Sequence, residues 1–386
     1  MECALGKRKN QHYVPQFYLR QFSSEKKTIN KFLLESSRYI ERASIRNTAS
    51  KPFFYDEGSF IEATLGKTES DSAPILKHII ETQTIPASEE DYMGLLRFIA
   101  TQTARTPRQS DTAEQFLTEI AVQLLQASGK CSENDLSPAS VIRDTLRVKN
   151  ALGEHLAVGS VLPMLLMTDL EPFLIINNSD QEFITSDIPI FCYNQLRVSL
   201  PGYSFGFGLP GAQIFFPISP KICFCLIDMA CYSIKQKGNY IRYSSNFTTR
   251  KINKMFCLNA YKELYFSESV NRSQIMPLLD VRKESSYASV QTLGAFTMLA
   301  FDAPRAYIDI PFFKIRQERA DDLRMLSARP VVEDTRPLYD AIESAAKFQH
   351  DAVIKEAKRA GVEVTPDNFR QLQSSAQEKS VPFDWV

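Results

Sequence analysis

The sequence lacks the short motifs that identify the common enzyme classes. It has no Gly-x-Gly-x-x-Gly at the start of a helix, no Walker loop, no His-Glu-x-x-His and no Gly-x-Ser-x-Gly elbow. It also lacks net charge, because 45 lysines and arginines balance 45 aspartates and glutamates. This balance argues against a protein that grips duplex nucleic acid nonspecifically, although it leaves room for a local basic patch.

Long hydrophobic runs are also missing. The most apolar stretch, 213–232, is interrupted by two prolines, a lysine and an aspartate, whereas a membrane-spanning helix needs about 20 consecutive apolar residues. Residues 1–10 are polar and basic and lack the apolar core of a signal peptide. We therefore expect a cytoplasmic protein with no membrane segment.

The seven cysteines do not form a metal-binding pattern with histidine partners. They are odd in number, scattered, and mostly set among apolar neighbours, which is typical of reduced thiols in the core of a cytosolic protein. No cofactor is evident in the sequence. A divalent metal such as Mg²⁺ or Mn²⁺ is compatible with its acidic residues, and metal use stays unknown at this point.

Hydrophobic periodicity predicts an α+β fold with one main domain. We expect a mainly helical N-terminal half packed against an antiparallel sheet that is built from hairpins in the second half. Residues at helical spacing predict helices at 59–81 (broken in two by Pro74), 88–106, 111–126, 140–156 and 247–266. Short apolar runs flanked by turn residues predict hairpins that pair 28–34 with 37–40, 173–176 with 183–185, and 214–216 with 222–227.

The composition changes along the chain and suggests three parts. Residues 1–270 form the expected core domain, and 271–329 form an extension packed on it. From 330 to 386 the chain is polar, with a charged helical stretch that has only a thin apolar stripe. We interpret this segment as an appendage and a candidate contact for a protein partner, and the sequence leaves open whether all of it is ordered.

Four polar clusters stand out as candidate sites, and the first two contain the expected proton-transfer and acidic groups. His12 precedes an aromatic run and could be a general base, because its unperturbed pKa of about 6.5 is near neutral pH. Glu62 and Glu69 are seven residues apart and share a helix face at a separation of about 10 Å, which suits ligands to different parts of one site. The ordinary alternatives are a packing histidine and a solvated helix face.

The other two clusters lie at the ends of a helix and of a strand. Gln102 and Arg105 are three residues apart on one helix face, where an amide and a guanidinium could hold a phosphate or carboxylate. Otherwise Arg105 caps its own helix through the helix dipole. Ser186 and Asp187 follow the apolar strand at 183–185 and lie just before a proline. They could be active residues delivered by a strand, or a turn whose aspartate satisfies local amides.

The same clusters lie in stretches that resemble a known family. In chain order the stretches read HYVPQFYLRQF, IEATLGKTES, FIATQTARTP, FITSDIPIF and IFFPISPKICFCL, with a weaker match, interpreted as a closing helix, in INKMFCLNAYKELYFS. Together they resemble the family catalogued as Domain of Unknown Function 4238. The resemblance implies one continuous domain over residues 10–270, and it implies no activity. It also implies that the polar residues inside these stretches converge, namely His12, Glu62, Glu69, Gln102, Arg105, Ser186 and Asp187.

The function favoured by the sequence is a hydrolase that acts on a phosphodiester, such as a nuclease. Acids, one histidine and one arginine are the residue types that phosphoryl chemistry uses. The catalytic residues would be His12, Glu62, Glu69 and Asp187. Arg105 would stabilise the negative charge of the transition state.

Two other functions stay open from the sequence. In one, Gln102, Arg105 and Ser186 bind a small anionic ligand, and the glycine-rich loop at 202–211 closes over it. In the other, the clusters form a buried polar network that only fixes the fold, and function resides in partner contacts of 330–386.

Overall fold

The computed structural model describes residues 9–55, 60–111, 164–196, 198, 207–235, 238–284, 287–288, 303–304, 308, 310, 312–316 and 358–359. The chain divides into two units, Met1–Ala328 and Arg329–Val386. The fold below is that of the first unit. The helices predicted at 111–126 and 140–156, and the appendage at 330–386, lie almost entirely outside the described residues, and these predictions stay open.

Helices occur in both halves of the described chain. The longer ones are α2 (Phe60–Thr82), α3 (Glu89–Ala104), α8 (Asn246–Asn259) and α9 (Arg272–Glu284), and the short ones are α1 (Gln16–Leu19), η1 (Arg20–Phe22) and η2 (Ile45–Asn47). The prediction that helices concentrate in the N-terminal half is therefore too narrow, because α8 and α9 follow most of the strands.

The first two predicted long helices are confirmed, with one correction. α3 begins after Ser88, whose hydroxyl accepts a hydrogen bond from the amide of Asp91 (3.1 Å). Pro74 lies inside α2 and does not break it. The proline removes one helical hydrogen bond, but Leu76 and Ile79 beyond it are completely buried. Their packing keeps the second part of α2 helical against the core.

Two larger sheets and three two-stranded ribbons make up the strands of the described residues. The five-stranded sheet has the order β11-β5-β9-β8-β7, with β5 (Glu171–Asn177), β7 (Phe191–Tyr193), β8 (Gln213–Ser219), β9 (Ile222–Ile227) and β11 (Tyr240–Tyr243). The four-stranded sheet has the order β3-β2-β12-β6, with β2 (Thr28–Leu33), β3 (Arg38–Ser44), β6 (Thr185–Ser186) and β12 (Glu263–Phe266). The ribbons pair β1 (Asn10–His12) with β4 (Ser50–Pro52), β10 (Tyr232–Ile234) with β15 (Phe313–Ile315), and β13 (Tyr287–Ala288) with β14 (Ala303–Pro304).

The five-stranded sheet is the centre of the core. Every residue of β8 and β9 is buried, as expected for apolar strands covered on both faces. These strands form the predicted hairpin, but β11 pairs with β5 in parallel, so the sheet is mixed and not purely antiparallel. Cys223 and Cys225 share one face of β9 with their Sγ atoms 3.8 Å apart. All five described cysteines are free thiols, as predicted.

The four-stranded sheet confirms one predicted hairpin and overturns two other predictions. β2 and β3 pair as expected. The predicted hairpin of 173–176 with 183–185 is wrong, because β5 joins the five-stranded sheet and β6 pairs with β12. The helix predicted at 247–266 ends at Asn259, and its last residues form β12. β12 makes backbone hydrogen bonds with β2 on one side and β6 on the other, and this tertiary pairing outweighs local helix propensity.

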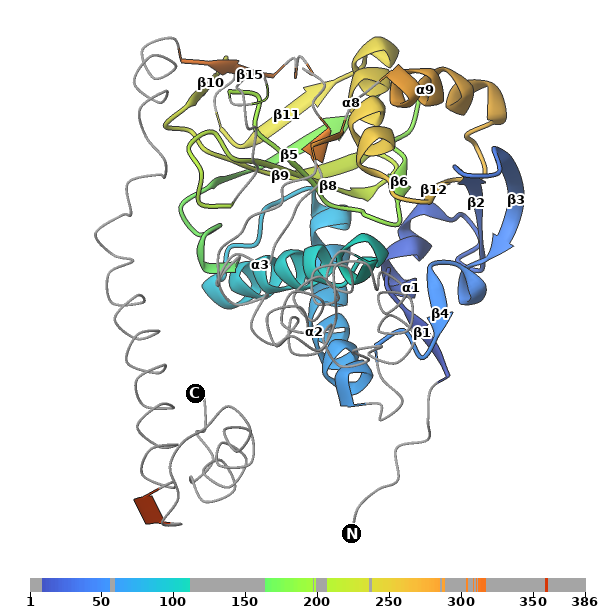
Figure 1. Ribbon diagram of the computed structural model, residues 1–386. Helices are drawn as coiled ribbons and strands as arrows, with labels where there is room; N and C mark the ends of the chain where they lie inside the picture. The colour runs from blue at the N-terminus through green and yellow to red at the C-terminus, as the bar shows by residue number, and fades with distance from the viewer. Residues whose placement is uncertain are drawn as a thin grey trace, which may run out of the picture. The chain divides into compact units, whose positions relative to one another are not determined.

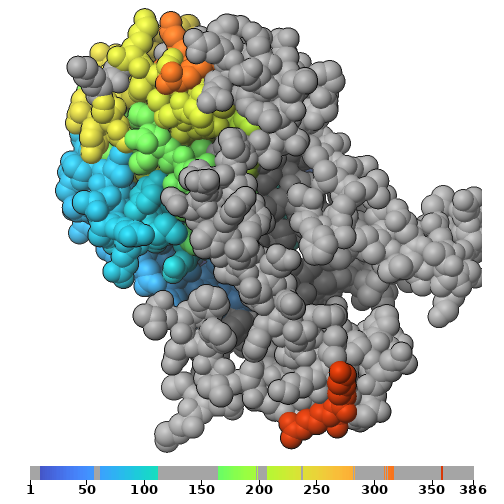
Figure 2. Space-filling view, turned by 90° about the vertical axis from the view of Figure 1, so that its left-hand side faces the viewer, coloured from blue at the N-terminus to red at the C-terminus, as the bar shows by residue number. Residues whose placement is uncertain are grey.

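Helices pack on different sides of the five-stranded sheet (Figure 1). α2 and α3 pack together below it, whereas α8 and α9 pack together near β6 and β12. On the face shown in Figure 2, residues of α2 and α3 (blue to cyan) lie below the green and yellow residues of the strands. One cluster of buried apolar side chains joins these layers. No helix among the described residues is long and apolar enough to cross a membrane.

Candidate functional site

The candidate site is built around Arg105, the residue that ends α3. Its side chain is 1% exposed, and Nε donates to Oε1 of Gln102 (2.7 Å) while Nη1 donates to Oε1 of Glu69 (2.7 Å). Gln102 donates from Nε2 to the carbonyl oxygen of Tyr13 (2.9 Å). We call these residues, together with Glu62 and His12 described below, the Arg105 cluster. It ties α3 to α2 and to the segment after β1.

One nitrogen of the guanidinium, Nη2 of Arg105, is buried and has no hydrogen-bond partner among the residues that the structure describes. Burial is the largest single influence and lowers the pKa of the Arg105 guanidinium, but Glu69, Tyr55 and Glu62 together outweigh burial, so the pKa is raised. The side chain is therefore a buried cation with one unsatisfied donor, which costs free energy. Such a donor calls for a bound anion or an ordered water molecule.

Both glutamates predicted for the site belong to α2 and act on this arginine. Glu69 is the ion-pair partner, and 27% of its side chain is exposed, so the cluster reaches the surface. Glu62 acts through its charge on Arg105 and on Tyr55. The prediction that the two glutamates reach different parts of one site stays a prediction.

Tyr55, which sequence reasoning missed, connects the cluster to β1. Its hydroxyl donates to the carbonyl oxygen of His12 (2.9 Å), and its amide donates to Oε1 of Gln11 (2.7 Å). Burial raises the pKa of Tyr55, so the hydroxyl keeps its proton at neutral pH. The one signal in the sequence was the Phe-Phe-Tyr run after Pro52.

His12 is held in one tautomer. Its Nε2 lies 3.0 Å from the carbonyl oxygen of Arg46, and a carbonyl oxygen only accepts, so Nε2 carries the hydrogen and the neutral ring has its lone pair on Nδ1. Burial lowers the pKa of His12, and the charges of Glu69 and Arg105 also act on the ring. Near pH 7 the imidazole is therefore neutral, which is the state a general base needs.

The lowered pKa of His12 predicts a pH dependence of stability. Below the ordinary histidine pKa of about 6.5, the unfolded chain binds a proton that the folded ring resists, so the free energy of unfolding falls as pH falls. Urea unfolding at several pH values between roughly 8 and 5 should show that His12→Gln removes part of this decrease. His78→Gln, at an exposed position of α2, is the control. A His12→Gln profile parallel to the wild-type profile would contradict the assignment.

Asp187 lies in a second polar cluster, between β6 and the turn before β12. It is completely buried, and its Oδ1 accepts from the amide of Tyr261 (2.8 Å). Its Oδ2 accepts from the amides of Lys262 (2.6 Å) and Glu263 (3.2 Å). Burial raises the pKa of Asp187 to about 6, although the amide hydrogen bonds oppose this shift. Asp187 thus satisfies backbone amides, as the turn alternative expected, but these amides belong to a segment distant in sequence and not to its own turn.

Ser186 also makes local hydrogen bonds. Its Oγ donates to the carbonyl oxygen of Ile188 (2.8 Å) and accepts from the amide of the same residue (3.1 Å). Tyr13 connects this second cluster to the first, because its carbonyl oxygen accepts from Gln102 and the charge of Asp187 acts on its hydroxyl. Of the seven predicted residues, the structure thus puts Arg105 and four others in the Arg105 cluster, and it puts Ser186 and Asp187 in the adjoining cluster.

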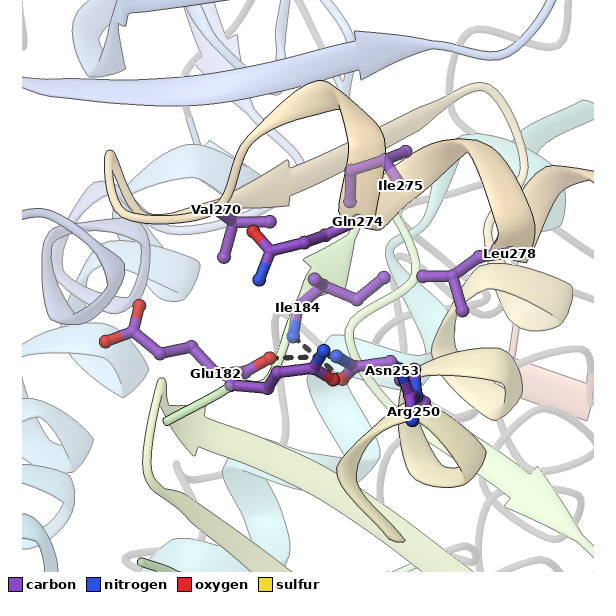
Figure 3. A pocket seen from close by; sticks show the side chains of 9 residues that line it. Glu182, Ile184, Arg250, Asn253, Val270, Gln274, Ile275 and Leu278 are labelled. Carbon is purple, nitrogen blue, oxygen red and sulfur yellow. Dashed lines mark hydrogen bonds between the residues drawn. The ribbon is translucent and has the colours of Figure 1, made fainter. Parts of the chain in front are cut away.

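A cavity between α8, α9 and the segment before β6 is too small for a substrate (Figure 3). Its volume of about 10 Å³ has room for about one water molecule. Figure 3 shows the amide of Asn253 directed at Glu182 and Ile184. Nδ2 donates to the carbonyl oxygen of Glu182 (2.8 Å), and Oδ1 accepts from the amide of Ile184 (3.1 Å). The side chain of Asn253 therefore holds the backbone of the segment before β6 against α8.

No group of three or more His, Cys, Asp or Glu side chains is arranged to hold a metal ion within the part of the chain that the structure describes. Glu62 and Glu69 are the acidic residues of the Arg105 cluster, and Glu69 is already paired with the arginine. Use of Mg²⁺ or Mn²⁺ by this pair stays a prediction.

The fold and the site define an α+β protein with a buried, arginine-centred polar cluster. The family model for Protein of unknown function (DUF4238) matches residues 10–269, which is more than half of the sequence, and the chain belongs to this family. No curated protein and no solved structure matches the chain. The family match runs from β1 to just beyond β12, so it contains both polar clusters and all seven predicted residues, and α9 lies outside it.

Proposed function

We propose that this chain binds a small anionic ligand, one with a phosphate or carboxylate group, at the Arg105 cluster. The observation that carries the proposal is Nη2 of Arg105, a buried cationic donor without a partner in the described part of the chain. The guanidinium is already oriented by Gln102 and Glu69. Because this planar donor is already held in place, it loses little conformational entropy when it binds an anion.

The carboxylates predicted as catalytic groups favour ligand binding over catalysis, because the structure already engages them in other contacts. Both carboxylate oxygens of Asp187 accept backbone amides, and Glu69 is held by Arg105. In the proposal Gln102 positions the guanidinium, whereas Ser186 and Asp187 hold the neighbouring backbone.

Ligand-induced stabilisation of the full chain tests this proposal. Inorganic phosphate, pyrophosphate or a nucleoside monophosphate at about 100 times its Kd should stabilise the fold by about 2.7 kcal/mol and raise Tm by roughly 3 °C. Arg105→Lys keeps the charge but loses the planar fork, and it should abolish the shift. Arg97→Lys, at an exposed position of α3, should keep it.

The contrary outcome has a clear meaning. If Arg105→Lys lowers Tm and no anion raises the Tm of the wild type, a buried water molecule satisfies Nη2 of Arg105. The cluster is then structural, and the search for function moves to protein partners, including the predicted contact at 330–386.

A second candidate, the phosphodiester hydrolase favoured by the sequence, is supported by the state of His12. A neutral imidazole with its lone pair on Nδ1, near a buried guanidinium, can accept a proton while Arg105 stabilises negative charge. Turnover of bis(p-nitrophenyl) phosphate and of a labelled oligonucleotide, with and without Mg²⁺ or Mn²⁺, should be lost in His12→Gln and kept in His78→Gln. Equal rates in both variants would exclude this role of His12.

We also propose that the protein is cytoplasmic. This location is supported by the free state of the five described thiols, because cytosolic proteins keep their cysteines reduced.

A further inference from the structure

The first described part of the chain is rich in exposed basic residues. Residues 9–52 contain nine lysines and arginines and only three acidic residues, although the whole chain has no net charge. In the sequence, Lys7 and Arg8 directly precede this segment. The exposed basic residues within it are Lys9, Arg20, Lys26, Lys27, Arg38, Arg42 and Arg46. Positive charge gathered in one segment attracts a polyanion locally.

Residues of this segment line an open polar depression beside the β1–β4 ribbon. Its volume is about 470 Å³, and it is lined by Asn10, Arg46, Asn47 and Ser50. Asn10 donates from Nδ2 to the carbonyl oxygen of Arg46 (3.0 Å), the same oxygen that fixes His12. The lining thus offers a guanidinium, two amides and a hydroxyl and no carboxylate, which is the chemistry that binds phosphate oxygens.

An exposed aromatic ring stands at the end of the same ribbon. Phe53 is 39% exposed, and it directly follows β4. Its amide donates to the carbonyl oxygen of Lys9 (2.8 Å), which extends the pairing of β1 with β4. The backbone of Phe53 has φ of 50°, a left-handed conformation that non-glycine residues rarely adopt and that gathers at functional positions.

Two lysines lie near Phe53 along the backbone of this ribbon, Lys9 across from it and Lys51 two residues before it. Lys9 is held opposite Phe53 by the amide hydrogen bond, and Lys51 lies over the ring of Phe54 at 5.4 Å. Lys9, Arg46 and Lys51 make no ion pair within the residues that the structure describes. Their charge is therefore available to a ligand.

We propose that this surface, formed by Lys9, Asn10, Arg46, Asn47, Ser50, Lys51 and Phe53 and called here the β1–β4 surface, binds single-stranded nucleic acid. Cationic and amide donors would contact phosphates, and an unstacked base would stack on Phe53. A duplex buries the faces of its bases and cannot use the ring, so the combination of charge and aromatic ring selects a single strand. The inference goes beyond anion binding at Arg105 and does not require it.

The electrostatic half of the proposal is tested by salt dependence. The full chain is titrated with a fluorescein-labelled oligothymidylate or oligouridylate of about twelve nucleotides at several salt concentrations. Each phosphate contact on a single strand contributes about 0.7 to the slope of log K against log salt. Arg46→Gln and Lys51→Gln should each weaken binding and reduce the slope by about this amount, whereas Arg97→Gln on α3 should leave both unchanged.

The stacking half is tested separately with a matched pair of aromatic residues. Phe53→Leu should weaken binding roughly 5- to 100-fold, the range of one stacked base, and leave the salt slope unchanged. Phe247 on α8 is also exposed (61%) and has Lys251 over its ring at 5.2 Å, so Phe247→Leu is the control and should bind like the wild type.

Three results would overturn the proposal. Equal affinity for duplex and single strand, or for heparin and the oligonucleotide, would show attraction to any polyanion. A Phe53→Leu variant that binds like the wild type would show that no base stacks on Phe53. Absence of binding at low salt would show that the β1–β4 surface does not bind nucleic acid. Arg105→Lys should bind the oligonucleotide normally, so failure of anion binding at Arg105 can be told apart from failure here.

Discussion

Replacing Asp187 with alanine is expected to lower the free energy of unfolding by about 3–5 kcal/mol. The carboxylate is completely buried and accepts the amides of Tyr261, Lys262 and Glu263. Alanine would leave three buried donors without a partner at the start of β12. Asparagine keeps the shape and removes the buried charge but offers only one acceptor oxygen, so Asp187→Asn should cost less, about 1–3 kcal/mol. Urea unfolding at neutral pH measures both values.

Asp180→Asn is the control for this prediction. Asp180 is exposed in the turn that follows β5, and its change should stay within about 0.5 kcal/mol of the wild type. If Asp187→Ala were as stable as this control and instead lost an activity, Asp187 would be a catalytic group and its amide contacts would be unimportant for folding.

Arg105→Met is expected to lower the free energy of unfolding by about 3 kcal/mol, since it breaks a buried ion pair from one side. The variant leaves the carboxylate of Glu69 without its cation and the side-chain oxygen of Gln102 without its donor. Glu69→Gln should cost less, because this side chain is partly exposed. A double-mutant cycle of the two positions should give a coupling energy of about 0.5–3 kcal/mol.

A surface ion pair on the same helix supplies the reference cycle. Lys77 and Glu81 on α2 are 3.7 Å apart, with 69% and 62% of their side chains exposed. Their coupling energy should stay below about 0.5 kcal/mol. If the cycle of Arg105 and Glu69 gave no more than this reference, the buried pair would not hold α2 to α3.

Patterns of local sequence predicted the elements that depend on local physics. The start of α3 follows from Ser88, and the hairpins β2–β3 and β8–β9 follow from apolar runs around turn residues. The errors lie where distant segments decide the outcome. β12 looks helical by itself, and it becomes a strand because β2 and β6 supply hydrogen bonds on both of its edges.

The candidate site shows the same division. The spacing of Gln102 and Arg105 correctly predicted one shared face, because three residues make nearly one helical turn. No spacing could show that Tyr55 lies against His12, or that Asp187 would be fully occupied by amides 74 to 76 residues away along the chain. Such contacts join segments whose separation in sequence carries no information about distance in space.

The sequence by itself determined the mixed helical and stranded class, the family to which the chain belongs and the residue types that gather at the site. These features depend on periodicity, capping and short motifs, each of which is local. Only the tertiary structure decided that Arg105 is a buried cation with a donor unsatisfied among the described residues, and that Phe53 is exposed at the end of the β1–β4 ribbon. Burial, pKa and the pairing of charges are properties of the surroundings, and folding creates those surroundings.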